Sequence, residues 1–255
     1  MMLKFITLMP HGEEVLNPKD DETKSLKMLM QEIGESANDI AEFIVLSPHS
    51  IRIMDHISII FSEHVSNGKD FPVDRKLAHI IFTESKRNNL PVVEVNYGAL
   101  EGKESKIPLD WGTSIPLEFF KNVKNLVIIS PARIIDINHL IKFGEILAQV
   151  TDNYENDIGI IVSADNAHSH KEDGPYGFSK YAKIYDDFII NSFKNNKIEA
   201  IAKLDEKIVE EAKPDSFWQI LVLVGILKRK NFLVQEIKYS CPSYFGMMAA
   251  KFTKV

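Results

Sequence analysis

The 255-residue chain contains a single cysteine, Cys241, and lacks the features of membrane or nucleic-acid-binding proteins. One cysteine excludes an intramolecular disulfide and a zinc cluster built from several thiolates. The longest apolar run, Ile220 to Leu227, is far shorter than a membrane span. The formal net charge of −6 gives no overall reason to expect a nucleic-acid partner, which favours a basic stripe. We therefore expect neither membrane nor nucleic acid as a partner.

The first residues, Met1 to Phe5, also lack the basic region, long apolar core and small-residue cleavage site of a secretory signal. They lead directly into an apolar run that predicts a strand. The expected location is the cytoplasm.

Apolar runs that predict buried strands alternate along the chain with helical stripes of apolar residues. The predicted strands cover 3–9, 43–46, 57–61, 92–95, 126–129, 158–162, 232–239 and 247–252. Helices are predicted around 26–37, 75–87, 137–147 and 181–189, and within 198–230. Without a long linker or repeat, this alternation predicts one three-layer α/β/α domain over 1–255, with a central mixed sheet.

Three other segments have specific local features. Residues 110–117 predict a turn that opens a short helix, with Pro116 tolerated in its first turn. The last long helix should begin at Asp215 or Ser216, where Ser216 and Gln219 fit a capping box. Residues 98–105 are polar and contain glycine, and are predicted to be loop.

The run at 158–162 ends abruptly in a loop that carries His168, His170 and a Gly-Pro-Tyr-Gly turn. Open α/β sheets place their sites just past the carboxyl ends of strands, in loops of this kind. The loop therefore predicts the wall of an active site. The alternative is a polar surface loop with two solvated histidines.

Two early predicted strands end in the same dipeptide, Pro10–His11 and Pro48–His49. Histidines that follow strands can converge at one edge of a sheet, and neutral imidazole is the commonest metal ligand. Two histidines and one carboxylate form the facial arrangement that holds non-haem Fe(II). The alternative is that each proline only ends its strand.

Five motifs occur along the chain in an order that resembles one family. They are PHGEE at 10–14, SPH at 47–49, DWGTSIPL at 110–117, SADNAH at 163–168 and DGPYG at 173–177. Together they resemble the class III extradiol ring-cleaving dioxygenase superfamily, which includes the protocatechuate 4,5-dioxygenase catalytic subunit. The likeness is greatest to single-chain archaeal and bacterial members, whereas MEMO-like proteins and plant DOPA dioxygenases are more distant. It spans nearly the whole chain.

The resemblance implies a metal bound by His11 and His49, with Fe(II) expected and zinc as the alternative. It places the third ligand at the start of the last long helix, where the family has Glu or, in some relatives, His. Ser216 stands at the matching position, or Asp215 with a shift of one residue. Asp215 would complete a set of two histidines and one carboxylate. Capping of the helix terminus would instead explain both residues without a metal.

The resemblance also assigns the residues around the metal. His168 matches the acid/base histidine of the family. Asp110, Trp111 and Thr113 match a motif that lines the pocket, so they are expected to contact substrate; family members commonly have His in place of Trp111. Tyr176 is expected at the rim of the pocket, or else packs the Gly-Pro-Tyr-Gly turn.

For each of four other residues the sequence leaves two interpretations open, as follows. His170 assists His168 or lies at the surface. Arg133 meets an anionic substrate or forms a structural ion pair. Cys241 is a buried small side chain or a thiolate ligand. Asp165 is solvated or capping.

The function implied by the resemblance is that of a metal-dependent extradiol dioxygenase, an enzyme of aromatic compound catabolism that opens a catecholic ring with O2. Its partners would be a small aromatic substrate and O2, in a homodimer or higher homo-oligomer. One alternative is a non-oxidative metal-dependent hydrolase with His168 as general base. Another is a MEMO-like protein that binds a metal or a partner without turnover. The departures at Trp111 and Ser216 leave these alternatives open.

Overall fold

The computed structural model describes residues 3–255 and is built around an eight-stranded sheet with the order β10-β11-β1-β9-β2-β8-β3-β6. The strands of this sheet are β1 (Leu3–Met9), β2 (Glu42–Leu46), β3 (Ile57–Ile60), β6 (Val92–Val95), β8 (Asn125–Ser130), β9 (Ile158–Ser163), β10 (Phe232–Ser240) and β11 (Met247–Lys254). The central strands β1, β9, β2 and β8 are parallel, whereas β11 pairs antiparallel with β1 and β3 antiparallel with β8. The predicted mixed sheet is confirmed.

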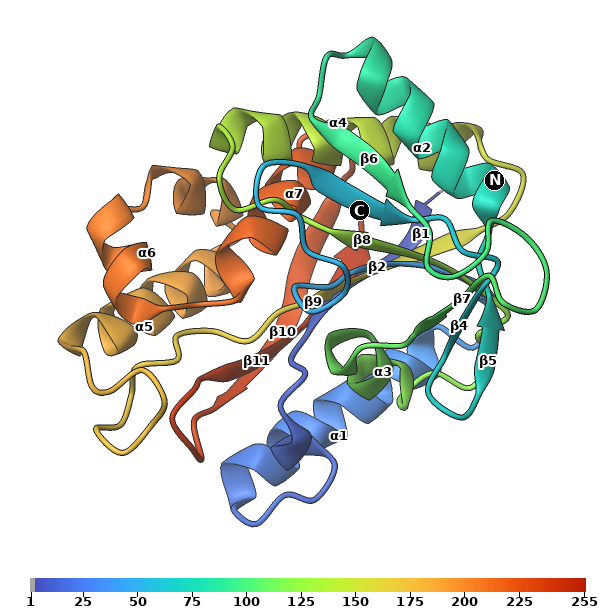
Figure 1. Cartoon of the computed structure of the whole chain (residues 1–255). Coiled ribbons are helices and arrows are strands. Elements are labelled where there is room, and N and C mark those ends of the chain that lie inside the picture. Colours follow the sequence, from blue (N-terminus) through green and yellow to red (C-terminus); the bar gives the residue numbers. More distant parts are fainter. Residues whose placement is uncertain (1–2) are drawn as a thin grey trace.

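Helices cover both faces of the sheet, which confirms the predicted three-layer α/β/α architecture (Figure 1). One face packs against α2 (Arg75–Arg87), α4 (Ile137–Asn153), α5 (Lys180–Lys194), η2 (Ile198–Lys203), α6 (Glu206–Ala212) and α7 (Ser216–Leu227). The other face packs against η1 (Glu13–Val15), α1 (Asp21–Ser36) and α3 (Trp111–Leu117). None of the helices within 3–255 combines the length and apolar character that a bilayer span requires.

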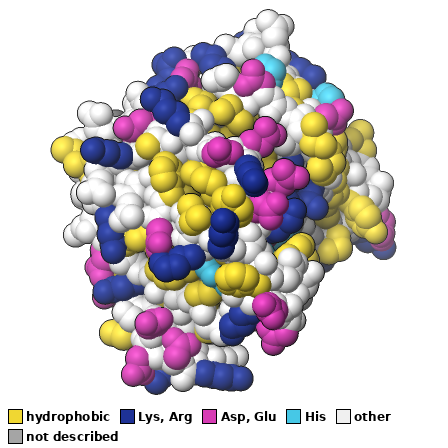
Figure 2. Space-filling model, turned by 90° about the vertical axis from the view of Figure 1, so that its left-hand side faces the viewer, with side chains coloured by type: hydrophobic (Ala, Val, Ile, Leu, Met, Phe, Trp, Pro, Cys, Tyr) yellow, Lys and Arg dark blue, Asp and Glu magenta, His cyan; other side chains and the backbone are white. Residues whose placement is uncertain are grey.

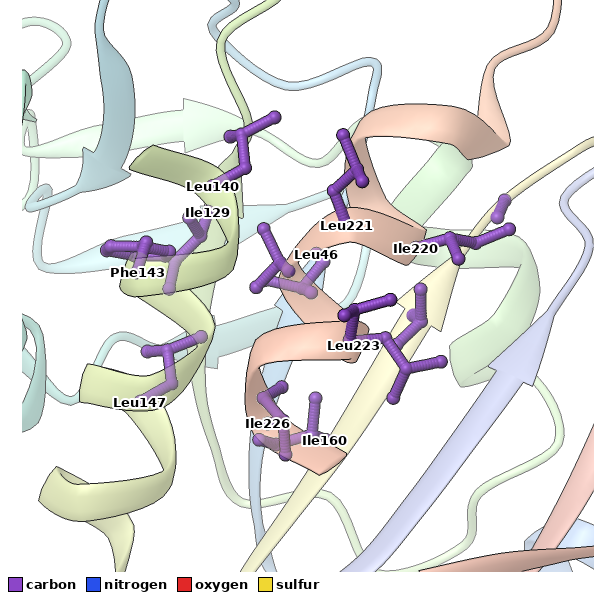
Figure 3. Packing of buried hydrophobic residues seen from close by; sticks show 14 of the residues in the cluster. Leu46, Ile129, Leu140, Phe143, Leu147, Ile160, Ile220, Leu221, Leu223 and Ile226 are labelled. Carbon is purple, nitrogen blue, oxygen red and sulfur yellow. The ribbon is translucent and has the colours of Figure 1, made fainter. Parts of the chain in front are cut away.

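Alternate side chains of each central strand enter different cores, because successive residues of a strand point to opposite faces. In β9, Ile160 and Val162 join the core under α4 and α7, whereas Ile161 joins the core under α1. Burial on both faces explains why these strands read as continuous apolar runs. Figure 3 shows the first core, where leucines and isoleucines of α7 interdigitate with α4 and with the sheet.

Two glycines let α4 and α7 approach each other closely. A Cβ atom on Gly144 of α4 would lie 1.9 Å from the carbonyl oxygen of Val222, and one on Gly225 of α7 would lie 1.9 Å from that of Ile141. The two helices therefore pack almost backbone to backbone. This contact fixes the position of α7, whose first residues reach the carboxyl edge of the sheet.

Three short strands were not predicted, and two local predictions were wrong. β4 (His64–Ser66), β5 (Asp70–Pro72) and β7 (Lys106–Pro108) form a second sheet of three strands. Pro116 lies near the end of α3 and not in its first turn. The capping box at Ser216 is absent, because Asp215 occupies the cap position and makes no side-chain cap hydrogen bond.

Candidate metal centre and active site

Four of the predicted site residues meet at the carboxyl edge of the central sheet. His11 follows β1, His49 follows β2 and His168 follows β9, and these three strands are adjacent and parallel. Asp215 reaches the same edge from the start of α7. The strand order therefore explains why residues far apart in the sequence form one cluster.

His11, His49 and Asp215 present three ligand atoms that lie within 4.8 Å of one another. The Nε2 atoms of the two histidines are 3.0 Å apart. Oδ2 of Asp215 lies 3.2 Å from Nε2 of His49 and 3.9 Å from Nε2 of His11. This is the donor set of a site for two histidines and one carboxylate.

Burial and local charge keep His11 and Asp215 in the forms that bind metal. Burial, together with the nearby His49, lowers the pKa of His11 to about 3, so its imidazole is neutral at neutral pH. Burial alone would raise the pKa of Asp215. The hydrogen bond to His49 and the charges of His168, His49 and Arg133 outweigh burial, and they lower the pKa of Asp215 below its usual range.

Arg133 orients the Asp215 carboxylate. Its guanidinium donates a hydrogen bond to Oδ1 of Asp215 and lies over the ring of Trp218, 4.4 Å from the centroid. Oδ2 is thereby left facing the histidines. The ion-pair reading of Arg133 is therefore confirmed.

Neither Asp215 nor Ser216 acts as a side-chain cap, which was the competing explanation for both residues. Ser216 is fully buried, and its hydroxyl is 2.8 Å from the hydroxyl of Tyr185. It does not belong to the group of potential ligands that includes Asp215. Of the two candidate positions, the structure brings only Asp215 to the histidines.

His168 lies beside the three potential ligands, and one of its ring nitrogens is already engaged in a hydrogen bond. Its Nδ1 is 2.8 Å from the carbonyl oxygen of Asn166, which only accepts, so Nδ1 carries the proton. Nε2 therefore keeps its lone pair when the ring is neutral, and it lies 3.7 Å from Oδ2 of Asp215. Burial lowers the pKa of His168 and favours this neutral form. The ring stacks on Phe245, at a centroid distance of 5.3 Å.

Asp165 is buried beside His11, so the prediction that it is solvated was wrong. Its Oδ1 accepts a hydrogen bond of 3.0 Å from the backbone N–H of His11, and its Oδ2 lies 3.3 Å from Nε2 of that residue. Burial raises the pKa of Asp165 well above its usual value. Asp165 thus holds the loop after β1 in place.

Two cavities are lined in part by residues of this cluster. The first, of about 730 Å³, is lined by His168, Tyr176, Arg133 and Asp215 together with apolar side chains of η2, α6 and α7. The second, of about 570 Å³, is lined by His49 together with Asp110 and Trp111. Tyr176 is half exposed, lines the first cavity and has its ring edge-on to His168.

The 110–113 motif contributes to the second cavity and not to the first. Trp111 stacks on the ring of His49 at a centroid distance of 4.2 Å and is half exposed. Asp110 lines the second cavity, but its carboxylate accepts hydrogen bonds from Ser47 (2.6 Å) and from the backbone and hydroxyl of Thr113. Thr113 is fully buried. The expected substrate contact of Thr113 is therefore wrong, because its buried hydroxyl donates to Asp110, the residue that caps α3.

His170 and Cys241 do not reach the potential ligands. Nε2 of His170 is 2.8 Å from Oδ2 of Asp186, whose Oδ1 accepts from the backbone N–H of Ala167 (2.9 Å). His170 is therefore neither a solvated residue nor a partner of His168, but part of a network that holds the loop after β9. Burial raises the pKa of Cys241 to about 11, and Cys241 does not belong to the group of potential ligands formed by His11, His49 and Asp215, so the interpretation as a ligand was wrong.

Sequence reasoning missed the aromatic wall formed by Tyr244 and Phe245. Both rings lie within 6.0 Å of His168, measured between centroids. They come from the turn between β10 and β11, far from His168 in the sequence. No local pattern marks this turn as part of the site, since its position depends on how β11 pairs with β1.

A family model described as the catalytic LigB subunit of aromatic ring-opening dioxygenase matches residues 16–252. The chain belongs to this family. Membership confirms the resemblance drawn from the sequence motifs, and the matched range includes His49, His168 and Asp215 but begins after His11. The LigB family is metal-dependent, and it comprises enzymes of the dioxygenase type that act on an aromatic substrate with O2.

Two individual proteins are similar to this member of the LigB family. Protein CA_C1420 of Clostridium acetobutylicum is 26% identical over 264 residues, which cover 94% of this chain and 55% of that protein. The chain thus spans about half the length of that relative. The crystal structure of uncharacterized protein JW3007 from Escherichia coli K12 has a TM-score of 0.61 and 14% identity, with 96% and 98% of the two chains covered. This likeness shows a shared fold.

Proposed function

We propose that this chain is a metal-dependent extradiol-type dioxygenase that opens a catecholic ring with O2. The observation that carries the proposal is the convergence of His11, His49 and Asp215, whose ligand atoms lie within 4.8 Å of one another at the carboxyl edge of the sheet. Family membership supports a dioxygenase-type enzyme. Fe(II) is the metal we propose, because two histidines and one carboxylate leave coordination positions open for both substrate and oxygen.

The chemistry of the donor set fits such a metal. His11 is neutral, and Asp215 is ionised with one oxygen directed at the histidines. The other oxygen is held by Arg133, which favours a single bond from the carboxylate to the metal. Trp111 stacks on His49 and restricts the orientation of its ring.

When bound, Fe(II) would hold a catechol through its hydroxyl oxygens together with O2, and would pass electrons between them. His168 has the geometry of the acid/base group. Its Nε2 lone pair faces the space beside Asp215, and Nδ1 is fixed by the Asn166 carbonyl. We propose that Nε2 accepts the proton of a catechol hydroxyl and returns it as the ring opens. His168 and Asp215 both line the first cavity, which would receive the ring of the substrate beside this group.

Figure 2 shows the face that carries α5 and α6, where Lys and Arg side chains are intermixed with Asp and Glu around a group of hydrophobic side chains. A face of mixed charge does not select a strongly charged polymer.

Oxygen uptake tests the proposal. The protein would be loaded with Fe(II) under anaerobic conditions, and O2 consumption would then be followed with a panel of catechols. We expect uptake together with a yellow ring-opened product. Hydrolysis of esters or amides that needs metal but not O2 would indicate the hydrolase alternative. Tight metal binding without either activity would indicate a binding protein of the MEMO-like kind.

A further inference from the structure

The hydroxyl of Ser163, the last residue of β9, links His11 to α3. Ser163 is fully buried, and its Oγ lies 2.9 Å from Nδ1 of His11. The same hydroxyl donates a hydrogen bond to the backbone carbonyl of Gly112, in the first turn of α3. Ser163 is thus the only protein contact of the His11 Nδ1 atom among the hydrogen bonds of the described residues.

Counting protons along this chain of hydrogen bonds determines the tautomer of His11. A hydroxyl has one hydrogen, and a carbonyl oxygen can only accept. Since Ser163 donates to Gly112, it has to accept from Nδ1 of His11. A neutral imidazole carries one proton, so a proton on Nδ1 leaves Nε2 with its lone pair. Nε2 is the atom that faces His49 and Asp215.

Pro116 explains why the Gly112 carbonyl is available to Ser163. In an α-helix this carbonyl would accept the N–H of the residue four positions later. That residue is Pro116, which has no N–H. The carbonyl therefore lacks its usual donor four residues later, and it accepts from the hydroxyl of Ser163 in β9. Pro116, which was predicted to lie in the first turn of a helix, thus has a specific consequence at the site.

We propose that Ser163 is a positioning residue that holds His11 in the Nδ1–H tautomer, with Pro116 leaving the Gly112 carbonyl open as the final acceptor. The functional consequence rests on the proposed function, in which Nε2 of His11 binds the metal. A ligand whose second nitrogen is held by a hydrogen bond is oriented and kept in the tautomer that can bind.

The tautomer can be measured in the metal-free wild-type protein by long-range ¹H–¹⁵N NMR of the histidine rings. The His11 signals are assigned by their loss in the His11→Asn variant. We expect a protonated Nδ1 and an unprotonated Nε2. A protonated Nε2 on His11 would overturn the proposal. This NMR measurement uses the wild-type protein, so it tests the His11 tautomer even if substitutions at Ser163 prevent folding.

Substitution of Ser163 tests the consequence for metal binding. We expect Ser163→Ala to weaken the binding of Co(II), followed by its visible absorption, by about tenfold to a hundredfold. Ser163→Thr keeps the hydroxyl and should restore most of the affinity. The matched control is Thr7→Val, which removes a buried hydroxyl that donates to a strand carbonyl (2.9 Å) and contacts no histidine. Wild-type affinity in Ser163→Ala, or an equal loss in Thr7→Val, would contradict the role of Ser163.

The two arms separate failure of this inference from failure of the proposed function. A wild-type protein that shows the Nδ1–H tautomer but binds no Co(II) would support the link from Ser163 to His11 and refute the metal centre. A protein that binds Co(II) tightly but shows a protonated Nε2 before loading would support the metal centre and refute the link.

Discussion

Each end of the central sheet buries a carboxyl side chain, but the pKa is lowered at one end and raised at the other. At the carboxyl edge, Asp215 is surrounded by His49, His168 and Arg133, and its pKa is lowered. At the amino end, Glu42 begins β2 with Asp74 as its neighbour, and burial followed by the interactions with Asp74 raises the pKa of Glu42 to about 7. Both side chains are shielded from water, yet one is held ionised and the other protonated at mildly acidic pH.

The comparison shows that neighbouring charge decides which buried carboxyl can be a ligand. Burial disfavours the charged form at both ends, and only the nearby imidazoles and guanidinium reverse that effect for Asp215. Glu42 accepts a hydrogen bond from the side-chain amide of Asn156, at 3.1 Å, but shares its surroundings with a second acid. Accordingly, the candidate metal ligands lie at the carboxyl edge of the sheet.

The largest effect is expected from Asp215→Ala, which removes the only carboxylate of the proposed ligand set. We expect Fe(II) affinity to fall more than about a hundredfold, beyond the loss typical of a residue that only supports a ligand. Isothermal titration with Fe(II) under anaerobic conditions measures this. Glu42→Gln is the control at the other end of the sheet and should bind like wild type. If Asp215→Ala bound Fe(II) as tightly as wild type, Asp215 would not be a metal ligand.

His168→Ala should separate metal binding from turnover. Because His168 is proposed to move a proton and not to bind metal, we expect kcat for oxygen uptake to fall by about 10² to 10⁴. Metal content after loading should be unchanged. If the variant loses the metal as well, His168 is a ligand, and the assignment of Asp215 has to be revised.

Glu42→Gln should change how stability depends on pH. The unfolded chain releases the Glu42 proton near pH 4.5, but the folded protein keeps it to about pH 7. Wild-type stability therefore falls as pH rises between these values, by up to about 3 kcal/mol. Gln does not ionise, so thermal unfolding should show the variant gaining Tm relative to wild type at pH 8 but not at pH 4.5. The same difference in Tm at both pH values would contradict the raised pKa of Glu42.

The smallest effect is expected from Tyr154→Phe. Tyr154 donates a hydrogen bond of 2.5 Å to Oδ2 of Asp74, the acid beside Glu42. Its loss should lower the free energy of unfolding by about 1 to 2 kcal/mol, measured by urea denaturation. Metal affinity should not change. A weaker metal site in this variant would mean that the two ends of the sheet are coupled.

Most of the main sheet and the large helices could be predicted from the sequence, because the central strands are buried on both faces. The run around Ile160 and Ile161 is apolar on successive residues, and such runs are visible without knowledge of the fold. β4, β5 and β7 were missed because each has only three residues, with a single buried side chain in the middle. Three residues are too few to establish a period of two.

The strand-end histidines of the site were predictable, but the groups that hold the site were not. His11 and His49 each follow a strand directly, so local sequence was enough to place them at one edge. The link from Arg133 to Asp215, and the contact of Phe245 with His168, join elements far apart in the chain. Such contacts depend on strand order and on the close packing of α4 against α7. Asp165 was misjudged for the same reason, since its burial comes from the loop after β1.

The central claim is that His11, His49 and Asp215 bind one metal ion, and an anomalous-scattering map of crystals loaded anaerobically with Fe(II) tests it most directly. The account predicts a single iron peak bonded to Nε2 of both histidines and to Oδ2 of Asp215, with His168 close by but not bonded. An iron peak bonded to His168 or Asp165 in place of Asp215, or no peak at this edge of the sheet, would contradict it.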